Sequence, residues 1–134
     1  MKTKTISQER AQYALEKVLE LKCDRKDFKS FSAGVPSMIL QNGFGQVLAF
    51  LLAKGSDKDL KEKKDDKHIV MLEIIREWLV KREMVKGNSN AEFIKNINNL
   101  TQDKYLAAQN ETLRLLEWVK RYANADLGVE DESK

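Results

Sequence analysis

Residues 35–54 form the most apolar stretch of a polar chain, and they limit the possible folds more than any other segment. Apolar residues recur there at three- and four-residue spacings, which mark a helix face, at Met38, Ile39, Phe44, Val47, Leu48, Leu51 and Leu52. Asn42-Gly43 is a typical place for a helix to stop in the left-handed conformation, and Gly45 permits close backbone approach where the next helix starts. The pattern predicts two buried helices joined at a tight Asn-Gly-Phe-Gly corner.

Composition extends this prediction to the whole chain. Its 134 residues include one proline and six glycines, and no segment shows a sustained alternation of period two. Leu, Ala, Glu and Lys, which are compatible with helices, are abundant. This length fits one domain. We therefore expect an all-α fold in which residues 1–134 form a single-domain bundle of about five to six helices.

Capping residues place the first two helices. Thr5 and Gln8 have the spacing of a capping box, which predicts a helix that runs to about Lys22. Asp24 can cap a second helix, in which the apolar phase continues across Pro36. This unbroken phase favours one kinked helix over two helices that meet at the proline, and either version ends at the corner.

A charged segment follows the apolar stretch. The third helix is expected over residues 44–54, with Gly55 as its stop. Residues 54–67 then alternate Lys, Asp and Glu, which predicts a charged connector, either solvated or marginally helical. It is the internal segment that we most expect to be disordered. After it, Asp65 or Asp66 can cap a fourth helix through about Val85, closed by Gly87-Asn88.

Two further caps predict the end of the chain. Ser89 and Glu92 form a second capping box that opens a short helix. Thr101 then caps the longest helix, which is expected to run to about Asn124 with buried positions at Leu106, Leu113 and Leu116. The acidic tail, about residues 126–134, is expected to be flexible.

The sequence holds little of the chemistry that catalysis needs. His68 is the only histidine and Cys23 the only cysteine, so a histidine-rich metal site is not expected, nor is a supported Cys-His pair. We interpret them as a first-turn surface histidine and an inert thiol near a helix end. No glycine-rich phosphate loop follows a strand. The sequence therefore predicts no enzyme activity, no metal and no cofactor.

Charge and hydropathy narrow the class of partner. The chain carries a net charge of +3, and residues 126–134 hold four acids and one lysine, so the remainder carries +6. That excess is compatible with nucleic acid without being diagnostic of it. No apolar run has the length of a signal peptide or a membrane span. We expect a soluble, cytoplasmic protein without membrane contact.

Two short segments resemble a known family. Pro36, the run Gln41-Asn42-Gly43-Phe44-Gly45-Gln46 and Leu48-Ala49-Phe50-Leu51, ending at Lys54, resemble the small all-helical subunit of type III-B (Cmr) CRISPR effector complexes. Glu117-Trp118-Val119-Lys120-Arg121-Tyr122-Ala123 resembles the last helix of that family. Together the two segments cover under a third of the chain, and their order and separation also fit.

The resemblance implies a function in antiviral defence. It implies a non-catalytic subunit, present in several copies, that stacks into a short filament and helps hold the guide and target RNA while other subunits cleave. Its partners would be the backbone and large subunits, neighbouring copies of itself, guide RNA and target RNA. The rival hypothesis is a helical adaptor that binds a protein partner and no nucleic acid. The unusually charged connector departs from the family pattern, so an interface there is not expected.

Two groups of candidate site residues follow. The resemblance assigns Pro36, Gln41, Asn42, Gly43, Gly45 and Gln46 to the structural corner, where we interpret the three amide side chains as partners of free backbone groups or, alternatively, as contacts to RNA or a protein. The candidate RNA-binding residues are Lys54, Arg114, Lys120, Arg121, Arg10 and Lys17. Lys120 and Arg121 follow Trp118, a combination that could contact phosphates, although a solvated, ion-paired face and a tryptophan that anchors the helix are the alternatives.

Overall fold

The computed structural model describes residues 3–125, and within that range the chain folds into six helices and no β-strand. The helices are α1 (Ile6–Leu19), α2 (Arg25–Asn42), α3 (Phe44–Lys54), α4 (Lys67–Lys81), α5 (Asn90–Asn98) and α6 (Gln102–Asn124). They form one compact domain, so the predicted all-α single-domain bundle is confirmed. No helix among these is both long and apolar enough to cross a membrane. The acidic tail lies outside the described residues.

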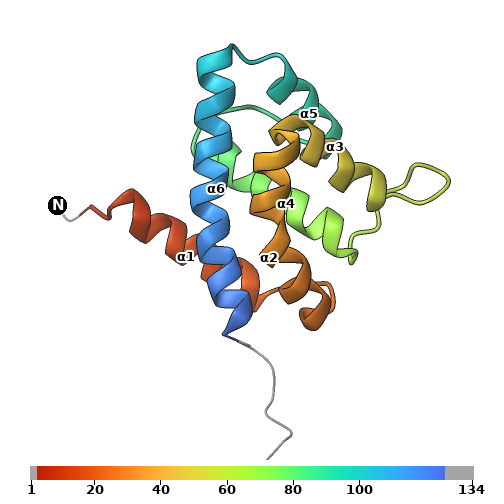
Figure 1. Cartoon of the computed structure of the whole chain (residues 1–134), viewed down its shortest axis with the longest axis horizontal. Helices are drawn as coiled ribbons and strands as arrows, with labels where there is room; N and C mark the ends of the chain where they lie inside the picture. Colours follow the sequence, from red (N-terminus) through yellow and green to blue (C-terminus); the bar gives the residue numbers. More distant parts are fainter. Residues whose placement is uncertain (1–2, 126–134) are drawn as a thin grey trace, which may run out of the picture.

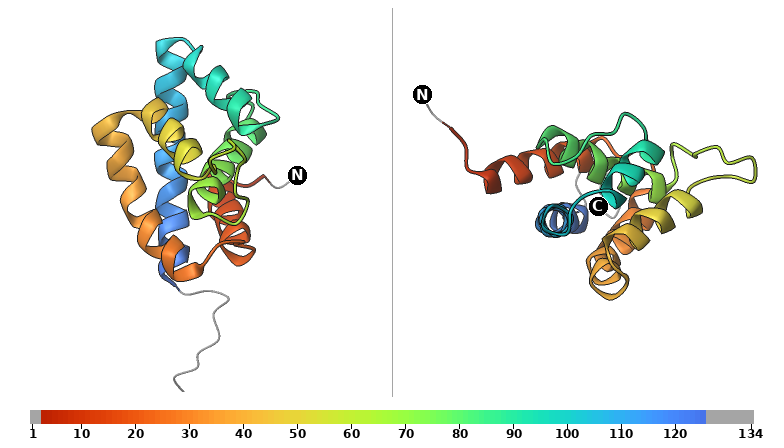
Figure 2. Two further views of the ribbon diagram at one scale, coloured as in Figure 1. Left: turned by 90° about the vertical axis from the view of Figure 1, so that its right-hand side faces the viewer. Right: turned by 90° about the horizontal axis from the view of Figure 1, so that it is seen from above.

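The long helix α6 lies along one side of the molecule, with α1 and α2 packed against it (Figure 1). Helices α3 and α5 form a second group, in which α3 packs on α2, α4 and α5 (Figure 2). Helix α4 lies between these groups, and eight of its residues are buried: Ile69, Val70, Met71, Leu72, Ile74, Ile75, Trp78 and Leu79. This burial on nearly every side explains why the apolar positions of α4 exceed a single stripe.

The predicted caps mostly begin the helices as expected. Thr5 and Gln8 form a complete capping box at α1, and Asp66 caps α4 by accepting from the His68 amide. At α5 only half of the predicted box forms, since Ser89 accepts from the Glu92 amide without the reciprocal bond. Thr101 occupies the N-cap of α6, but its hydroxyl donates to Asp103 instead of accepting from the backbone.

Helix α2 continues through Pro36 without a break. The proline removes one amide donor, but the apolar phase on both sides keeps Phe28, Val35 and Ile39 buried in the same core. The structure therefore has one helix where the sequence left two versions open. A single residue, Gly43, then separates α2 from α3, and its φ of 91° with ψ of 152° lies in a region that is essentially restricted to glycine.

Two predicted helix ends are too late, and each has a local cause. Helix α1 ends at Leu19 and not near Lys22, because the Arg25 guanidinium donates to the carbonyls of Val18 and Leu19.

Helix α4 ends at Lys81 and not near Val85. Glu83 has a φ of 59°, its amide donates to Val80, and the Met84 amide donates to Leu79, which together make a Schellman motif. Gly87, expected to close the helix, is instead where the backbone passes close to α5, since a Cβ there would lie 2.7 Å from the Phe93 Cα.

The charged connector forms a loop that projects from the bundle and not a helix (Figure 2). An antiparallel bridge joins Ser56 to Glu62, and the Asp57 carboxylate accepts from the amides of Asp59 and Lys61. Its tip holds Leu60 with a φ of 64° and 86% of its surface exposed. Side-chain caps and backbone pairing therefore give this polar segment a defined path.

One predicted core position is wrong. Leu106 is 43% exposed, because it falls on the outer stripe of α6, and not on the face that packs against α1 and α2. The buried positions of α6 are Ala108, Thr112, Leu115, Leu116, Val119 and Ala123. Small residues and a threonine, whose hydroxyl donates to the Ala108 carbonyl, make this inner face hard to recognise from apolar pattern alone.

Candidate nucleic-acid interface

Three of the predicted RNA-binding residues lie along the outer side of α6. Arg114 and Arg121 are exposed and seven residues apart, so they share one stripe of the helix. Lys120 is half-buried on the flank of the same helix. No carboxylate of the described chain lies within ion-pairing distance of these three residues, and that includes the neighbouring Glu117. The predicted alternative of a face paired with Glu117 therefore does not form within the described chain.

Arg10 has a different environment. Its side chain is buried, and Nε and Nη2 donate to the two oxygens of Glu111 at 2.6 and 2.8 Å. The Trp78 indole donates to the same carboxylate at 2.9 Å. This cluster joins α1, α4 and α6 in the interior of the bundle. A guanidinium that makes a bidentate ion pair inside a fold is poorly placed to bind a phosphate.

The cluster also sets the protonation of its carboxylate. Burial alone would raise the pKa of Glu111, but the hydrogen bonds from Arg10 and Trp78 and the charge of Arg10 outweigh it. The pKa of Glu111 is therefore lowered. In the folded protein at neutral pH Glu111 is therefore ionised, and its ion pair with Arg10 holds the arginine side chain in place.

Lys17 also has internal partners. Its ammonium lies 3.0 Å from Glu77 and 3.7 Å from Glu20, and 5.4 Å from the centre of the Tyr13 ring. Tyr13 is buried, and its hydroxyl donates to the Ile74 carbonyl at 2.7 Å. Lys17 thus helps to join α1 to α4. Arg10 and Lys17, which lie seven residues apart on α1, therefore each make a contact between helices.

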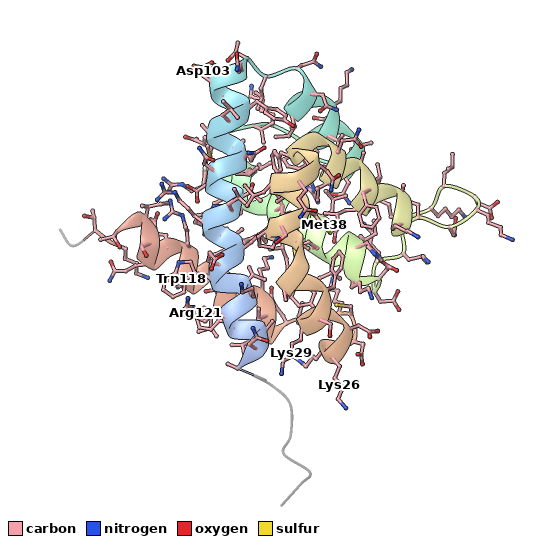
Figure 3. The ribbon with its side chains drawn as sticks, viewed as in Figure 1. Lys26, Lys29, Met38, Asp103, Trp118 and Arg121 are labelled. Carbon is pink, nitrogen blue, oxygen red and sulfur yellow. The ribbon has the colours of Figure 1, made fainter. Side chains whose placement is uncertain are left out.

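Lys54 is exposed at the last turn of α3, next to the projecting loop. This end of α3 lies on the opposite side of the bundle from α6 (Figure 1). By contrast, two lysines that the sequence analysis did not select lie at the same end of the molecule as the last turns of α6, on the other side of that helix from Arg121. Lys26 and Lys29 are at the N-terminal end of α2, at the same end of the molecule as Arg121 (Figure 3).

This proximity comes from the antiparallel packing of α2 on α6. The Gly45 amide, just beyond the end of α2, donates to the Tyr105 hydroxyl near the start of α6. The end of α2 therefore lies beside the start of α6, and the start of α2 lies beside the end of α6. Helical phase within one segment cannot reveal such a pairing.

The corner residues have mainly structural contacts. The Asn42 side chain donates to the Met38 carbonyl at 3.2 Å, one turn back in the same helix. Gln41 and Gln46 are exposed, and their side chains make no hydrogen bond within residues 3–125. The start of α3 is instead held by Tyr105, and a Cβ at Gly45 would lie 2.9 Å from the Asn98 side chain.

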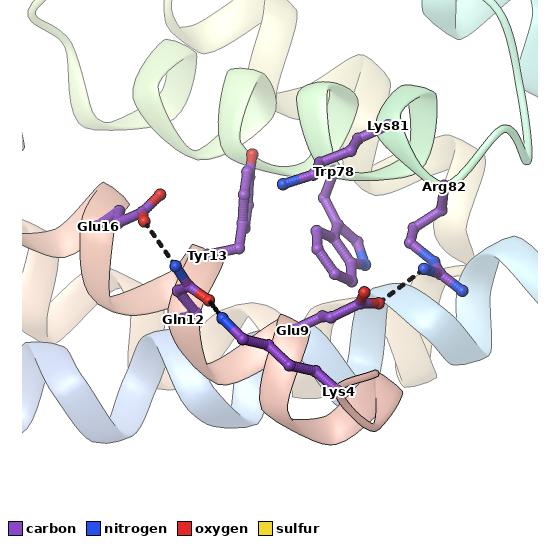
Figure 4. Close-up of a pocket in the computed structure, with 8 residues that line it drawn as sticks. All are labelled: Lys4, Glu9, Gln12, Tyr13, Glu16, Trp78, Lys81 and Arg82. Carbon is purple, nitrogen blue, oxygen red and sulfur yellow. Dashed lines mark hydrogen bonds and ion pairs between the residues drawn. The ribbon is translucent and has the colours of Figure 1, made fainter. Parts of the chain in front are cut away.

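A polar groove of about 380 Å³ lies between α1 and the end of α4 (Figure 4). It is lined by Lys4, Glu9, Gln12, Tyr13, Glu16, Trp78, Lys81 and Arg82. Its groups are largely satisfied by one another, since Arg82 lies 2.9 Å from Glu9 and Lys4 donates to Gln12. None of the predicted RNA-binding residues lines this groove.

Cys23 and His68 make no hydrogen bond to each other within residues 3–125. Burial raises the pKa of the Cys23 thiol to about 11, which disfavours the nucleophilic thiolate. His68 is half-buried rather than a surface residue, with its ring edge-on to Phe31 and Phe50 and Nδ1 at 2.8 Å from Asp66. Within residues 3–125 no three His, Cys, Asp or Glu side chains are grouped to hold a metal ion.

Comparison with known proteins gives one consistent family. The model of a family described as CRISPR-associated protein (Cas_Cmr5) matches residues 6–126. The chain is 31% identical over 133 residues to the CRISPR system Cmr subunit Cmr5 of Thermotoga maritima, which covers 98% of this chain and 92% of that protein. The fold is similar to the crystal structure of a CRISPR-associated Cmr5 family protein from Thermus thermophilus, with a TM-score of 0.68, 26% identity and coverage of 91% and 97% of the two chains.

Proposed function

Because the chain belongs to the Cmr5 family of CRISPR-associated proteins, we propose that it acts as a non-catalytic subunit of a type III-B (Cmr) effector complex. In this proposal several copies stack beside the subunits that carry the guide RNA. Their surfaces help to hold the guide and target RNA during antiviral defence, and other subunits cleave the target.

The unpaired cations of α6 carry the RNA-binding part of this proposal. Arg114, Lys120 and Arg121 have no carboxylate partner in the described structure, whereas Arg10 and Lys17 do. An unpaired cation at the surface loses no ion pair when it meets a phosphate, and it releases counterions from the nucleic acid. We therefore assign the RNA contact to α6 and not to α1.

Lys26 extends this basic end. Lys26 is exposed at the first turn of α2, and the end of α6 lies beside that turn (Figure 3). One copy offers only a few phosphate contacts, so it would bind RNA weakly alone. Several copies along one RNA path would add their contacts, which is the physical reason for a stacked arrangement.

A second candidate function, a protein-binding adaptor, rests on a separate observation. Leu40 is 69% exposed near the end of α2 and Leu106 is exposed near the start of α6, and the bond between Gly45 and Tyr105 holds these two ends together. Leu40 and Leu106 are two of the four large hydrophobic side chains that the described residues expose, and exposed apolar side chains are of the kind that a partner protein covers. In this alternative, the end of the bundle that holds Leu40 and Leu106 contacts a partner protein, and the subunit makes no contact to nucleic acid.

The assembled complex tests the proposal. A Lys120→Ala, Arg121→Ala subunit should keep its helicity and still assemble, but target RNA should bind less tightly whatever its sequence. The salt dependence should also flatten, by roughly 0.7 in the logarithmic slope for each phosphate of single-stranded RNA that the two side chains no longer neutralise. Since every copy carries the change, the effect adds over the copies that touch RNA.

The matched control is Lys58→Ala with Lys61→Ala, which removes two exposed charges from the projecting loop. It should leave affinity and slope unchanged. If the α6 variant also binds RNA normally, the RNA contact lies elsewhere. If it folds but does not assemble, α6 is a protein interface and the adaptor function is favoured.

A further inference from the structure

The last turns of α6 carry a pair of stacked aromatic rings. The ring centres of Trp118 and Tyr122 are 6.0 Å apart, and their planes differ by 27°. Both side chains are half-buried against the core, so part of each ring faces outward. The four-residue spacing places both on one flank of the helix.

Within the part of the chain that the structure describes, the polar ends of both rings lack partners. The Trp118 indole and the Tyr122 hydroxyl make no hydrogen bond with residues 3–125. In that same part of the chain, no side-chain nitrogen or oxygen is both buried and unpartnered. The Trp118 N–H and the Tyr122 hydroxyl therefore reach solvent, where a ligand could bond to them.

Trp78 shows what a purely structural tryptophan looks like in this protein. It is only 1% exposed, its indole donates to Glu111, and the Arg82 guanidinium lies 5.8 Å from the ring centre. Trp118 differs on all three points, since no described cation covers its ring. A tryptophan that anchors a helix in the core usually pairs its indole N–H, as Trp78 does.

Cations border the aromatic pair. Arg114 lies one turn before Trp118 and Arg121 lies three residues after it, and both are exposed without a carboxylate partner in the described structure. Trp118 and Arg121 lie on the same side of α6 (Figure 3). Aromatic rings that hold bases, next to cations that hold phosphates, are the usual means of binding single-stranded nucleic acid.

We propose that the Trp118–Tyr122 pair is a stacking site for an unpaired base of single-stranded RNA, with Arg114 and Arg121 contacting the adjoining phosphates. This rests on the proposed function and specifies the ligand of the same helix. The site accepts any base, because every base has an aromatic face. It adds an uncharged component to binding that salt does not screen.

A fluorescent analogue tests the site without changing the fold. 5-Hydroxytryptophan replaces tryptophan in this subunit alone, which is then assembled into the complex and excited where ordinary tryptophan does not absorb. Saturation with target RNA should change the emission. The change should be absent from a labelled Trp118→Phe subunit, in which Trp78 alone reports. No change at saturation would overturn the proposal, and a change on assembly that RNA does not alter would make the pair a protein contact.

Affinity separates this site from the phosphate contacts. Trp118→Leu should weaken target binding about tenfold at every salt concentration with the salt slope unchanged, while Trp118→Phe should stay within about threefold. Lys120→Ala with Arg121→Ala should change the slope. If the charge variant behaves as expected but Trp118→Leu binds normally, the stacking site is wrong and the proposed function stands. If the charge variant binds normally, the assignment of the RNA contact to α6 is wrong, and that result is distinct from the result for Trp118→Leu.

Discussion

At the scale of single residues, the same residue type serves two purposes in this protein. Arg10 is fixed by a carboxylate 101 positions away in the sequence, whereas Arg121 has no ion-pair partner in the described chain. Helical spacing made Arg10 an RNA candidate and the family resemblance made Arg121 one, and both signals describe only a single helix. Neither can show that Glu111 lies opposite Arg10 in the folded chain. Only the packing of α1 on α6 supplies that information.

Glu111→Gln is expected to destabilise the fold by about 2 kcal/mol or more, because it leaves the Arg10 charge inside the bundle without its partner. The pKa of Glu111 is lowered in the folded state, so its contribution is present above its ordinary value of 4.5 and is lost as pH falls through the folded-state pKa. Denaturation of both proteins across this range should show the stability difference shrinking in acid. A difference that is constant with pH would contradict the assignment.

Gly43→Val is expected to destabilise the fold by a few kcal/mol, because a β-branched residue is strained at a φ of 91°. A Cβ there would meet no atom within 4 Å, so the expected cost comes from backbone strain. Gly34→Ala is the control, since Gly34 is an exposed helical position with equally open space and no positive φ. It should stabilise by about 0.5–1 kcal/mol. Equal melting temperatures for the valine variant and the wild type would show that the corner is placed wrongly.

At the scale of helices, the sequence predicted the number and order of elements well, and it missed the C-terminal ends of α1 and α4 alone among the ends that it placed. N-caps are local, so Thr5, Asp24 and Ser89 identify helix starts within a few residues. The two missed ends involve a side chain from the next element, as with Arg25, or a non-glycine residue in the left-handed region, as with Glu83. Neither leaves a reliable sequence signal.

Ser89→Ala is expected to cost about 1 kcal/mol of unfolding free energy, because the serine hydroxyl oxygen accepts from the Glu92 amide at the start of α5. Thr101→Ala is the matched control. Thr101 holds the same N-cap position in α6, but its hydroxyl accepts no bond from a backbone amide. Its replacement should therefore lower the unfolding free energy by only a few tenths of about 1 kcal/mol. Urea denaturation of both variants measures the difference, and equal losses would argue against this distinction.

Glu83→Gly is expected to stabilise the protein by about 0.5–1 kcal/mol, since glycine removes the cost of a left-handed residue at the end of α4. The melting temperature should rise while the helical dichroism stays the same. Glu92→Gly, within α5 at ordinary helical φ, should instead destabilise by a similar amount. A loss of stability at both positions would contradict the Schellman motif.

At the scale of the whole molecule, the packing decides which charges are available. Helix α1 uses its cations in contacts to α4 and α6, and the outer side of α6 keeps Arg114, Lys120 and Arg121 unpaired in the described chain. Antiparallel packing of α2 on α6 then brings Lys26 and Lys29 to the same end (Figure 3). The family resemblance could identify the last helix as a candidate. It could not identify which cations the fold leaves available or which second helix adjoins them.

The salt dependence of target-RNA binding, measured on the assembled complex with single substitutions, tests this account most directly. Arg121→Ala and Lys17→Ala each remove one positive charge, but only Arg121 is unpaired in the described structure. Arg121→Ala should reduce the logarithmic salt slope by roughly 0.7 for each copy that contacts RNA, and Lys17→Ala should leave it unchanged. An unchanged slope for Arg121→Ala, or an equal reduction for Lys17→Ala, would contradict the claim that the unpaired cations of α6, and not the paired cations of α1, contact RNA.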